Sequence, residues 1–268
     1  NLFDWNLKEL WQYKDLIYMF IIRDFAAVYK QTILGPLWYI IQPLITTLVY
    51  AMVFGGLTKM STEGQPKMLF YMSGIIFWNY FSGNLLKNAD TFLIYSHLFG
   101  KVYFPRLTAP IAATISGLLA LGFQILVLAV LYIYYLIHGA DIKINYTLFL
   151  FPYLLLLICL LSMSLGMIVT SLTIKYRDLK HLVTFGIQLA MWVTPVVYPL
   201  SGVTNLKLQT LIKLNPLSSI IETLRYSILG TGSFHWLDIL YSTVFTLLTL
   251  IIGITLFNKT EKYFIDTI

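Results

Sequence analysis

Long apolar stretches, separated by short polar segments, dominate the pattern of hydrophobic and polar positions in this chain. A helix needs about 20 apolar residues to cross the hydrocarbon of a bilayer. Six stretches approach or exceed that length, over residues 33–57, 68–86, 107–137, 147–174, 182–200 and 237–257. The third is longer than a bilayer requires, so we expect it to tilt, bend or project. The pattern predicts an all-α integral membrane protein with six transmembrane helices, in which residues 1–268 form a single transmembrane domain.

The segment before the first span has helical periodicity, but its apolar part is too short to cross a bilayer. Its apolar positions recur at helical spacing, opposite polar positions: Leu10, Tyr13, Ile17 and Phe20. We therefore expect residues 1–32 to hold an amphipathic helix in the membrane interface. A soluble helix packed on another domain is the weaker alternative, because no soluble domain follows.

The segment between the fifth and sixth spans, residues 203–236, is too long for a simple turn. It holds two short amphipathic sequences, LKLQTLIKL and LSSIIETLRYSIL, and Asn215-Pro216 breaks the chain between them. Neither sequence is long enough to span. We expect two short re-entrant helices that lie in or dip into the outer interface, a device that can plug or gate an exit.

Small and polar residues inside the spans indicate which helices pack on protein. Ser162, Gly166 and Thr170 recur every four residues in the fourth span, and a shorter row begins in the third: Ala113, Gly117 and Leu121. The second span is unusually polar and contains Ser73, Asn79, Ser82 and Asn84. We expect it to face other helices or a wet path rather than lipid.

The composition and the charges support this topology. The chain has 58% hydrophobic and 11% charged residues and a mean hydropathy of +0.77, more apolar material than a soluble domain can bury. Its start does not resemble a cleaved signal peptide, so we expect insertion rather than secretion. The net charge is +6, but the basic residues lie singly between apolar runs, which excludes a nucleic-acid-binding stripe. Most lysines and arginines fall on the side of the termini, so the positive-inside rule predicts cytoplasmic termini.

The sequence offers no motif for enzyme chemistry. His97, His138, His181 and His235 lie in separate loops, and the sequence contains no H-E-x-x-H or nucleophile motif and no phosphate-binding G-x-x-x-x-G-K-[ST] loop. The single cysteine, Cys159, lies in an apolar run and is expected to pack there. We expect a chain without catalytic residues, metal or cofactor. A membrane-bound acyl- or glycosyltransferase would need a carboxylate or histidine cluster, and acids are nearly absent from the spans.

Several motifs resemble the permease subunits of polysaccharide ABC exporters, which carry O-antigen, capsule or teichoic acid chains. ILGPLWYIIQP (33–43) looks like the start of that family's first span, HLFGKVYFPR (97–106) like its cytoplasmic loop after span two, and KYRDLKHL (175–182) like its loop after span four. TPVVYPLSGV and LNPLSSIIE resemble the segments that flank its outer re-entrant helices. The resemblance covers nearly the whole chain, with the motifs in the right order.

The resemblance implies a multi-pass permease of the bacterial plasma (inner) membrane that exports a lipid-linked glycan. Two copies would form a homodimer with the transport path between them, surrounded by membrane lipids. Two ATP-binding cassette subunits would bind ATP and Mg and supply the energy. Within the family, the alternative substrate is a small hydrophobic molecule or drug, which would predict a short closed pocket instead of a continuous tunnel. A purely structural scaffold would need neither the polar second span nor the outer helices.

The resemblance also implies a cytoplasmic coupling helix in the loop at residues 90–106. It would insert five residues into a cleft on the ATP-binding subunit: Tyr95, Ser96, His97, Leu98 and Phe99. Exposed aromatic residues in a loop usually contact a partner. The alternative is a solvated connector.

Four aromatic residues are candidates for a glycan path: Tyr39, Trp78, Tyr80 and Trp192. Aromatic faces stack on the C–H faces of pyranose rings while they allow sliding, which suits a polymer that must move. The alternative is anchoring at the membrane interface, where tyrosine and tryptophan are enriched in any case.

Basic residues near the predicted cytoplasmic interface are candidates for a lipid-phosphate site and cytoplasmic gate. These are Arg23, Lys30 and Arg177, with Asp178 beside the last. An arginine fork fits phosphate geometry, and a nearby lysine adds charge. The alternatives are topology determination, snorkelling, or an Arg177–Asp178 structural pair.

Glu222 and Arg225 lie three residues apart on the second outer helix and are candidates for an outer gate. They could close the exit or contact emerging sugar. The alternative is an exposed ion pair within the helix, which contributes only a few tenths of a kcal/mol.

Overall fold

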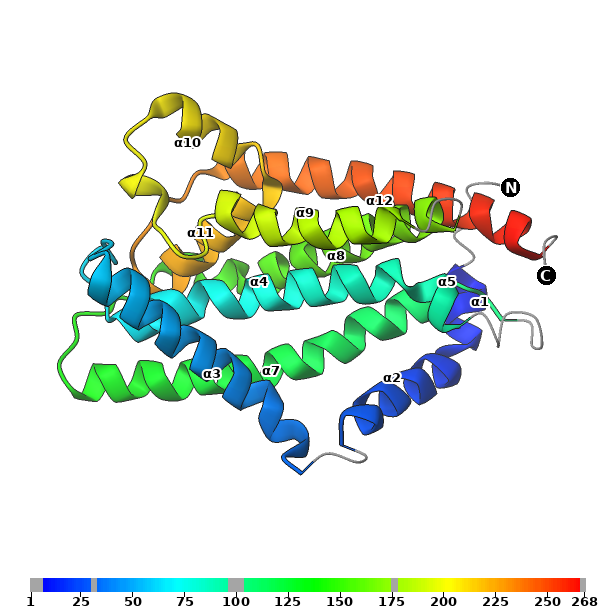
Figure 1. Cartoon of the computed structure of the whole chain (residues 1–268), viewed down its shortest axis with the longest axis horizontal. Coiled ribbons are helices and arrows are strands. Elements are labelled where there is room, and N and C mark those ends of the chain that lie inside the picture. Colours follow the sequence, from blue (N-terminus) through cyan, green and yellow to red (C-terminus); the bar gives the residue numbers. More distant parts are fainter. Residues whose placement is uncertain (1–6, 30–32, 96–103, 175–177, 266–268) are drawn as a thin grey trace.

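The computed structural model describes residues 7–29, 33–95, 104–174 and 178–265, and every regular element in these ranges is a helix (Figure 1). The described helices form an elongated bundle. Helix α1 (Leu7–Gln12), helix α5 (Thr91–Ile94) and the C-terminal end of α12 (Trp236–Ile265) lie at one end of the bundle. Helices α10 (Leu206–Lys213) and α11 (Pro216–Leu229) lie at the other end. This arrangement confirms the all-helical prediction and separates the predicted coupling segment from the predicted outer helices.

Four stretches are long and apolar enough to cross a membrane: Gly35–Leu57, Thr108–Ile137, Tyr146–Thr173 and Trp236–Thr260. The first consists of η1 (Gly35–Leu37), α3 (Trp38–Tyr50) and η2 (Ala51–Leu57). The second is α7 (Thr108–Ile137), and the third joins η3 (Tyr146–Leu150) to α8 (Phe151–Thr173). The remaining two predicted spans form α4 (Lys67–Ala89), which has the length but is more polar, and the shorter α9 (Leu179–Val193).

The predicted helix over residues 182–200 was wrong at its C-terminal end. Helix α9 ends at Val193, and Thr194 is extended, with φ −88° and ψ 139°. Pro195 follows directly, and a proline disfavours the helical conformation for the residue before it. The chain continues without regular helix to a short turn, η4 (Leu200–Gly202).

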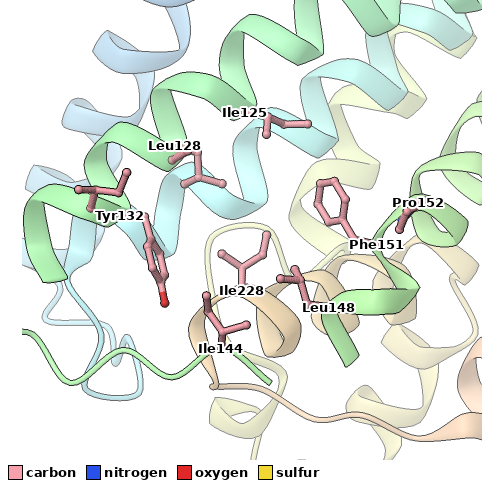
Figure 2. A pocket seen from close by; sticks show the side chains of 10 residues that line it. Ile125, Leu128, Tyr132, Ile144, Leu148, Phe151, Pro152 and Ile228 are labelled. Atoms are coloured by element: carbon pink, nitrogen blue, oxygen red, sulfur yellow. The ribbon is translucent and has the colours of Figure 1, made fainter. Parts of the chain in front are cut away.

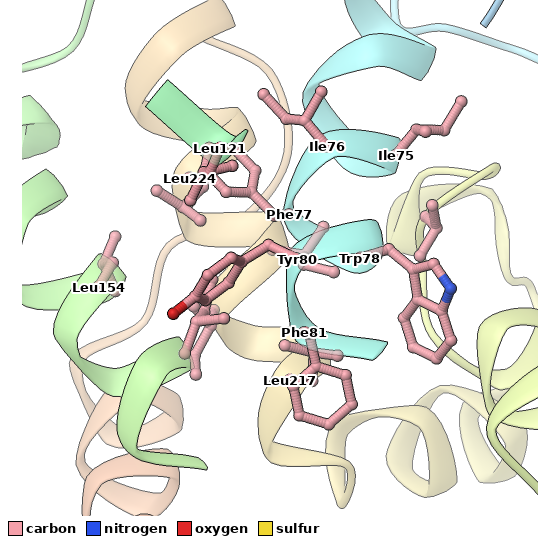
Figure 3. Packing of buried hydrophobic residues seen from close by; sticks show 14 of the residues in the cluster. Ile75, Ile76, Phe77, Trp78, Tyr80, Phe81, Leu121, Leu154, Leu217 and Leu224 are labelled. Atoms are coloured by element: carbon pink, nitrogen blue, oxygen red, sulfur yellow. The ribbon is translucent and has the colours of Figure 1, made fainter. Parts of the chain in front are cut away.

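Helix α4 lies at the centre of the bundle, which explains why a predicted span could be so polar. Its apolar side chains pack against Leu121 of α7, Leu154 of α8, and Leu217 and Leu224 of α11 (Figure 3). Ser73 and Asn84 are buried, at 1% and 4% exposure, which confirms that this helix faces protein. A helix shielded from lipid by its neighbours can carry polar side chains as long as they find partners.

The small-residue row in α8 lets α4 approach closely, as the sequence predicted. Asn84 Nδ2 of α4 donates a hydrogen bond to Ser162 Oγ of α8 over 2.6 Å. One turn further along, a Cβ added to Gly166 would lie only 2.4 Å from Asn88 Cβ and 2.8 Å from the Leu85 carbonyl oxygen. Only a glycine therefore fits at this crossing.

The N-terminal segment forms α1 and α2 (Lys14–Tyr29). The predicted apolar face packs inward, with Leu10 and Phe20 each 7% exposed. Phe20 joins a second core cluster with Phe92, Phe104 and Phe257. This cluster fastens α2 to the end of the bundle that also carries α5.

The two outer helices are separated at Asn215-Pro216, as predicted. Asn215 Oδ1 caps α11 by accepting a hydrogen bond from the Leu217 amide over 3.1 Å, and Gly230 ends the helix at φ +76°. Helix α11 is buried along most of its length against α4, α8 and α12. It therefore dips into the bundle instead of lying on its surface.

The close contact of α4 and α8 can be tested at Gly166. We expect Gly166→Ala to lower the free energy of unfolding by about 1–3 kcal/mol, because the added methyl group collides with Asn88 and Leu85. Gly122→Ala is the matched control, since Gly122 is also a helical glycine and its added Cβ meets no atom within 4 Å. Thermal unfolding of the purified protein in detergent measures both, and equal effects would contradict the packing argument.

Candidate functional site

A groove of about 360 Å³, the half-polar groove, lies between α3, α4 and α7, and its mainly apolar walls include a polar part. Tyr39 of α3 and Tyr80 of α4, two of the four predicted path residues, line it. Polar side chains from three helices complete it: Gln42, Asn79, Ser82, Asn84, Lys87 and Gln124. The groove contains both aromatic rings and hydrogen-bonding groups, the two kinds of surface that a sugar requires.

The two tyrosines are held in place by their neighbours. The Tyr80 hydroxyl lies 3.0 Å from Cys159 Sγ and 3.2 Å from the Thr114 carbonyl oxygen, so it is anchored to α8 and α7. The Tyr39 ring stacks on Phe123, with ring centroids 6.4 Å apart and an interplanar angle of 9°. These contacts fix the walls of the groove before any ligand arrives.

The two predicted tryptophans lie elsewhere. Trp78 is 4% exposed and packs against Phe81 in the core (Figure 3). Trp192 of α9 is 54% exposed, and the centroid of its ring lies 6.0 Å from the centroid of the Phe54 ring. The structure therefore does not bring the four aromatic residues together into one path.

A charged cluster ties α2 to α4 close to the groove. Asp24 Oδ1 accepts a hydrogen bond from Arg23 Nη2 over 2.7 Å, and Asp24 Oδ2 lies 2.8 Å from Lys87 Nζ. The Asp24 side chain is only 9% exposed, whereas those of Arg23 and Lys87 are 42% and 35% exposed. One carboxylate thus serves two cations, and the cluster keeps a net positive charge.

Arg23 also joins α2 to the segment that follows α5. Its Nη2 donates to the Tyr95 hydroxyl over 2.7 Å, and its guanidinium lies 4.8 Å from the Tyr95 ring centroid. Burial acts to lower the pKa of Arg23, but the hydrogen bonds and charges of Asp24 and Tyr95 outweigh it and raise that pKa. Burial, with the charge of Asp24, also raises the pKa of the Tyr95 hydroxyl. A charged guanidinium therefore donates to a neutral phenol.

The predicted coupling residues have different outcomes. Tyr95, which we expected to enter a cleft on an ATP-binding subunit, is instead 3% exposed and packs against Phe20. This expectation was wrong, because the Tyr95 ring packs in the core cluster that fastens α2. Four further coupling residues, and two of the predicted phosphate ligands, lie outside the described residues: Ser96, His97, Leu98, Phe99, Lys30 and Arg177.

Asp178 directly precedes α9 and is exposed. Close to it, Lys180 of α9 forms an ion pair with Asp90 at the end of α4, over 2.8 Å. The sequence analysis missed this pair, because its partners are far apart in the chain. It connects the end of α4 with the start of α9.

The alternative that Glu222 and Arg225 form an exposed ion pair is wrong, because both side chains are buried. Arg225 is 0% and Glu222 is 2% exposed, and Arg225 Nη1 lies 3.2 Å from Glu222 Oε1. Arg225 Nη2 donates to the Val196 carbonyl oxygen over 2.9 Å, and its guanidinium lies 4.1 Å from the Phe70 ring centroid. Gly74 makes the space, since a Cβ there would lie 2.9 Å from Arg225 Nη2. The burial follows from α11 entering the bundle, which its periodicity alone did not require.

Two residues of the charged cluster escaped the sequence analysis. Lys87 and Asp24 were not singled out, although a lysine at the end of a polar span and an acid beside Arg23 were visible signals.

Among the described residues, no group of three or more His, Cys, Asp or Glu could hold a metal ion.

The charged cluster can be tested by Asp24→Asn. We expect this change to lower the free energy of unfolding by about 1–2 kcal/mol, since it leaves two partly exposed cations without their carboxylate. Hydrogen exchange in α2 should also become faster. Asp141→Asn is the control, because Asp141 and Lys143 form a pair with 83% and 77% exposed side chains, and its loss should cost less than about 0.5 kcal/mol. Unchanged exchange in α2 would refute the fastening role.

Comparison with known proteins identifies the family. The chain matches the ABC-2 type transporter family over residues 15–229. It is 26% identical over 254 residues to the O-antigen export system permease protein RfbA of Klebsiella pneumoniae, and this alignment covers 94% of each chain. The protein of the same name from Myxococcus xanthus is 27% identical over 219 residues, or 81% of each chain. Because the family match covers most of its length, this chain belongs to the ABC-2 type transporter family.

Proposed function

We propose that this chain is the permease of an ATP-driven exporter that moves a lipid-linked polysaccharide from the cytoplasm across the bacterial plasma membrane. The polysaccharide would be of the O-antigen, teichoic acid or capsule type. The observation that carries this proposal is the similarity to O-antigen export permeases over 94% of the chain. The half-polar groove within a bundle of membrane-length helices supports it.

The proposed topology has six spans and both termini in the cytoplasm. Helices α4 and α9 would cross the membrane together with the four more apolar stretches. α9 is short, at about 22 Å, but the non-helical segment that follows it is buried from Thr194 to Val197. Non-helical backbone is tolerated at membrane depth where protein covers it and satisfies its polar groups. The hydrogen bond from Arg225 to the Val196 carbonyl supplies one such partner.

In this proposal the groove receives the substrate on the cytoplasmic side. The sugar nearest the lipid would contact Tyr39 and the polar side chains of α4. Its phosphate would be attracted to Arg23 and Lys87, whose joint charge exceeds that of Asp24. We thus propose Arg23, together with Lys87, as the ligands of the phosphate.

Energy would come from two separate ATP-binding subunits that carry ATP and Mg. They would act on the loop at residues 90–106, which directly follows α4. Because α4 carries one wall of the groove and Asp90 pairs with Lys180 of α9, a displacement of this loop would move both helices. The chain itself would be a transport subunit and not an enzyme.

A second copy of the chain would cover α9. This helix has no buried residue, and one stripe of it is apolar and at least half exposed: Leu182, Phe185, Leu189, Trp192 and Val193. In the homodimer, Trp192 would lie at the subunit interface, next to the transport path. The residue would therefore still lie near the glycan, as the sequence analysis expected.

ATPase activity of the complex in nanodiscs tests the function. We expect lipid-linked glycan to stimulate the activity and a panel of small amphiphiles to leave it unchanged. Tyr39→Ala and Arg23→Gln should each reduce the stimulation several-fold without changing basal activity, since they remove about 1–3 kcal/mol of contacts with sugar or phosphate. Tyr146→Ala, at a tyrosine that is 69% exposed and outside the groove, is the control. Stimulation by the amphiphiles alone would exclude polysaccharide export.

Cysteine cross-linking in membranes tests the homodimer. In a Cys159→Ala background, Phe185→Cys should yield a disulfide-linked dimer on mild oxidation, because the two copies would meet along α9. Val130→Cys, at a residue of α7 that is similarly exposed at 57%, should remain monomeric on a denaturing gel. Cross-linking at position 130 and not at position 185 would place the interface elsewhere.

A further inference from the structure

A second pocket lies at the end of the bundle that carries α10 and α11. It is an open pocket of about 410 Å³ that is lined by residues of α7, the start of α8 and α11. Figure 2 shows side chains from all three converging on it, with Leu128 and Tyr132 from α7, Phe151 from α8 and Ile228 from α11. Its walls are almost wholly apolar. The pocket is thus distinct from the half-polar groove in place and in chemistry.

The pocket lies within the apolar part of the bundle. Its α7 wall belongs to the stretch Thr108–Ile137, and its α8 wall to Tyr146–Thr173, both long and apolar enough to cross a membrane. Beside it, α7 presents a strongly exposed apolar surface through Leu126, Val130 and Ile133, each 57–59% exposed. In a membrane such a surface faces lipid, so the mouth of the pocket adjoins the hydrocarbon.

The chemistry of the walls decides what can occupy this space. Water does not fill an apolar cavity that offers it no hydrogen-bonding partners. An empty cavity would deprive its walls of dispersion contacts on one side. A flexible hydrocarbon chain from the adjoining bilayer fills the space at no cost in desolvation, since it leaves an equally apolar medium. Phospholipids are by far the most abundant source of such chains, and mass action favours them.

We propose that this pocket binds one acyl chain of a phospholipid from the outer half of the bilayer, and that the chain packs against Ile228 of α11. The outer location rests on the proposed topology. Ile228 lies one helical turn from the buried Arg225, on the helix that dips into the bundle. The lipid chain therefore supports the outer helix next to its contact with α4, and loss of the chain would loosen α11.

Photo-labelling of the complex in nanodiscs tests this site without substrate or ATP, so the result is independent of transport. The probe is phosphatidylethanolamine with a diazirine near the end of one acyl chain, diluted into phosphatidylethanolamine and phosphatidylglycerol. After irradiation, mass spectrometry of peptides should find the label concentrated on the pocket walls around Tyr132, Ile144 and Phe151. Label spread evenly over the lipid-facing surface of α7 would overturn the proposal.

Two matched pairs of variants sharpen the test. Ala129→Trp fills the pocket from α7 and should abolish the wall labelling, whereas Val130→Trp places the same ring on the neighbouring lipid-facing position and should leave it intact. Leu148→Trp and Phe149→Trp repeat the comparison from η3, so one misfolded variant does not decide the outcome. If a photoreactive polyprenyl phosphate labels the walls and displaces the phospholipid, the occupant is the lipid carrier, and our assignment is wrong.

Discussion

The close contact between α4 and α8 is the constraint on which the rest of this structure depends. Within a membrane, lipid tails are as apolar as leucine, so helices associate through van der Waals packing and interhelical hydrogen bonds. Gly166 supplies the first by letting the α8 backbone approach Asn88, and Asn84 supplies the second through Ser162. With α4 held in this way, α7, α11 and α3 pack around it, and the polar residues of α4 are shielded from lipid.

Helix α4 then serves two different purposes along its length. Near its N-terminal end it makes room, at Gly74, for the fully buried guanidinium of Arg225. A buried charge is costly unless it is paired and hydrogen-bonded, and here Glu222 and the Val196 carbonyl provide both. This one side chain fastens α11 and the non-helical segment after α9 to the same part of α4. Towards its C-terminal end, α4 lines the half-polar groove and reaches Asp24 through Lys87.

The two ends of the bundle are therefore connected through one helix. Groups that would receive a charged, sugar-bearing lipid lie near α2 and α5, and the helices that would control release lie at the opposite end. The family assignment to the ABC-2 type transporters gives this arrangement its context, because a transporter must respond at one face to an event at the other. An acyl chain beside α11 would add the bilayer itself to the forces that hold the outer helix.

The sequence by itself determined where the helices run, since a 20-residue apolar length and a period of 3.6 residues are local properties. It also determined the break at Asn215-Pro216 and the close-packing row from Ser162 to Thr170, because proline and glycine affect the local backbone in the same way wherever they lie.

Only the tertiary structure decided which neighbouring segment covers each face of a helix. Trp78 and Tyr80 are two residues apart on α4 and both pack in the core, yet Tyr80 also lines the groove whereas Trp78 does not. Tyr95, Glu222 and Arg225 were expected at a surface and are buried. Periodicity reports which residues share a face of a helix, whereas burial depends on which distant segment covers that face.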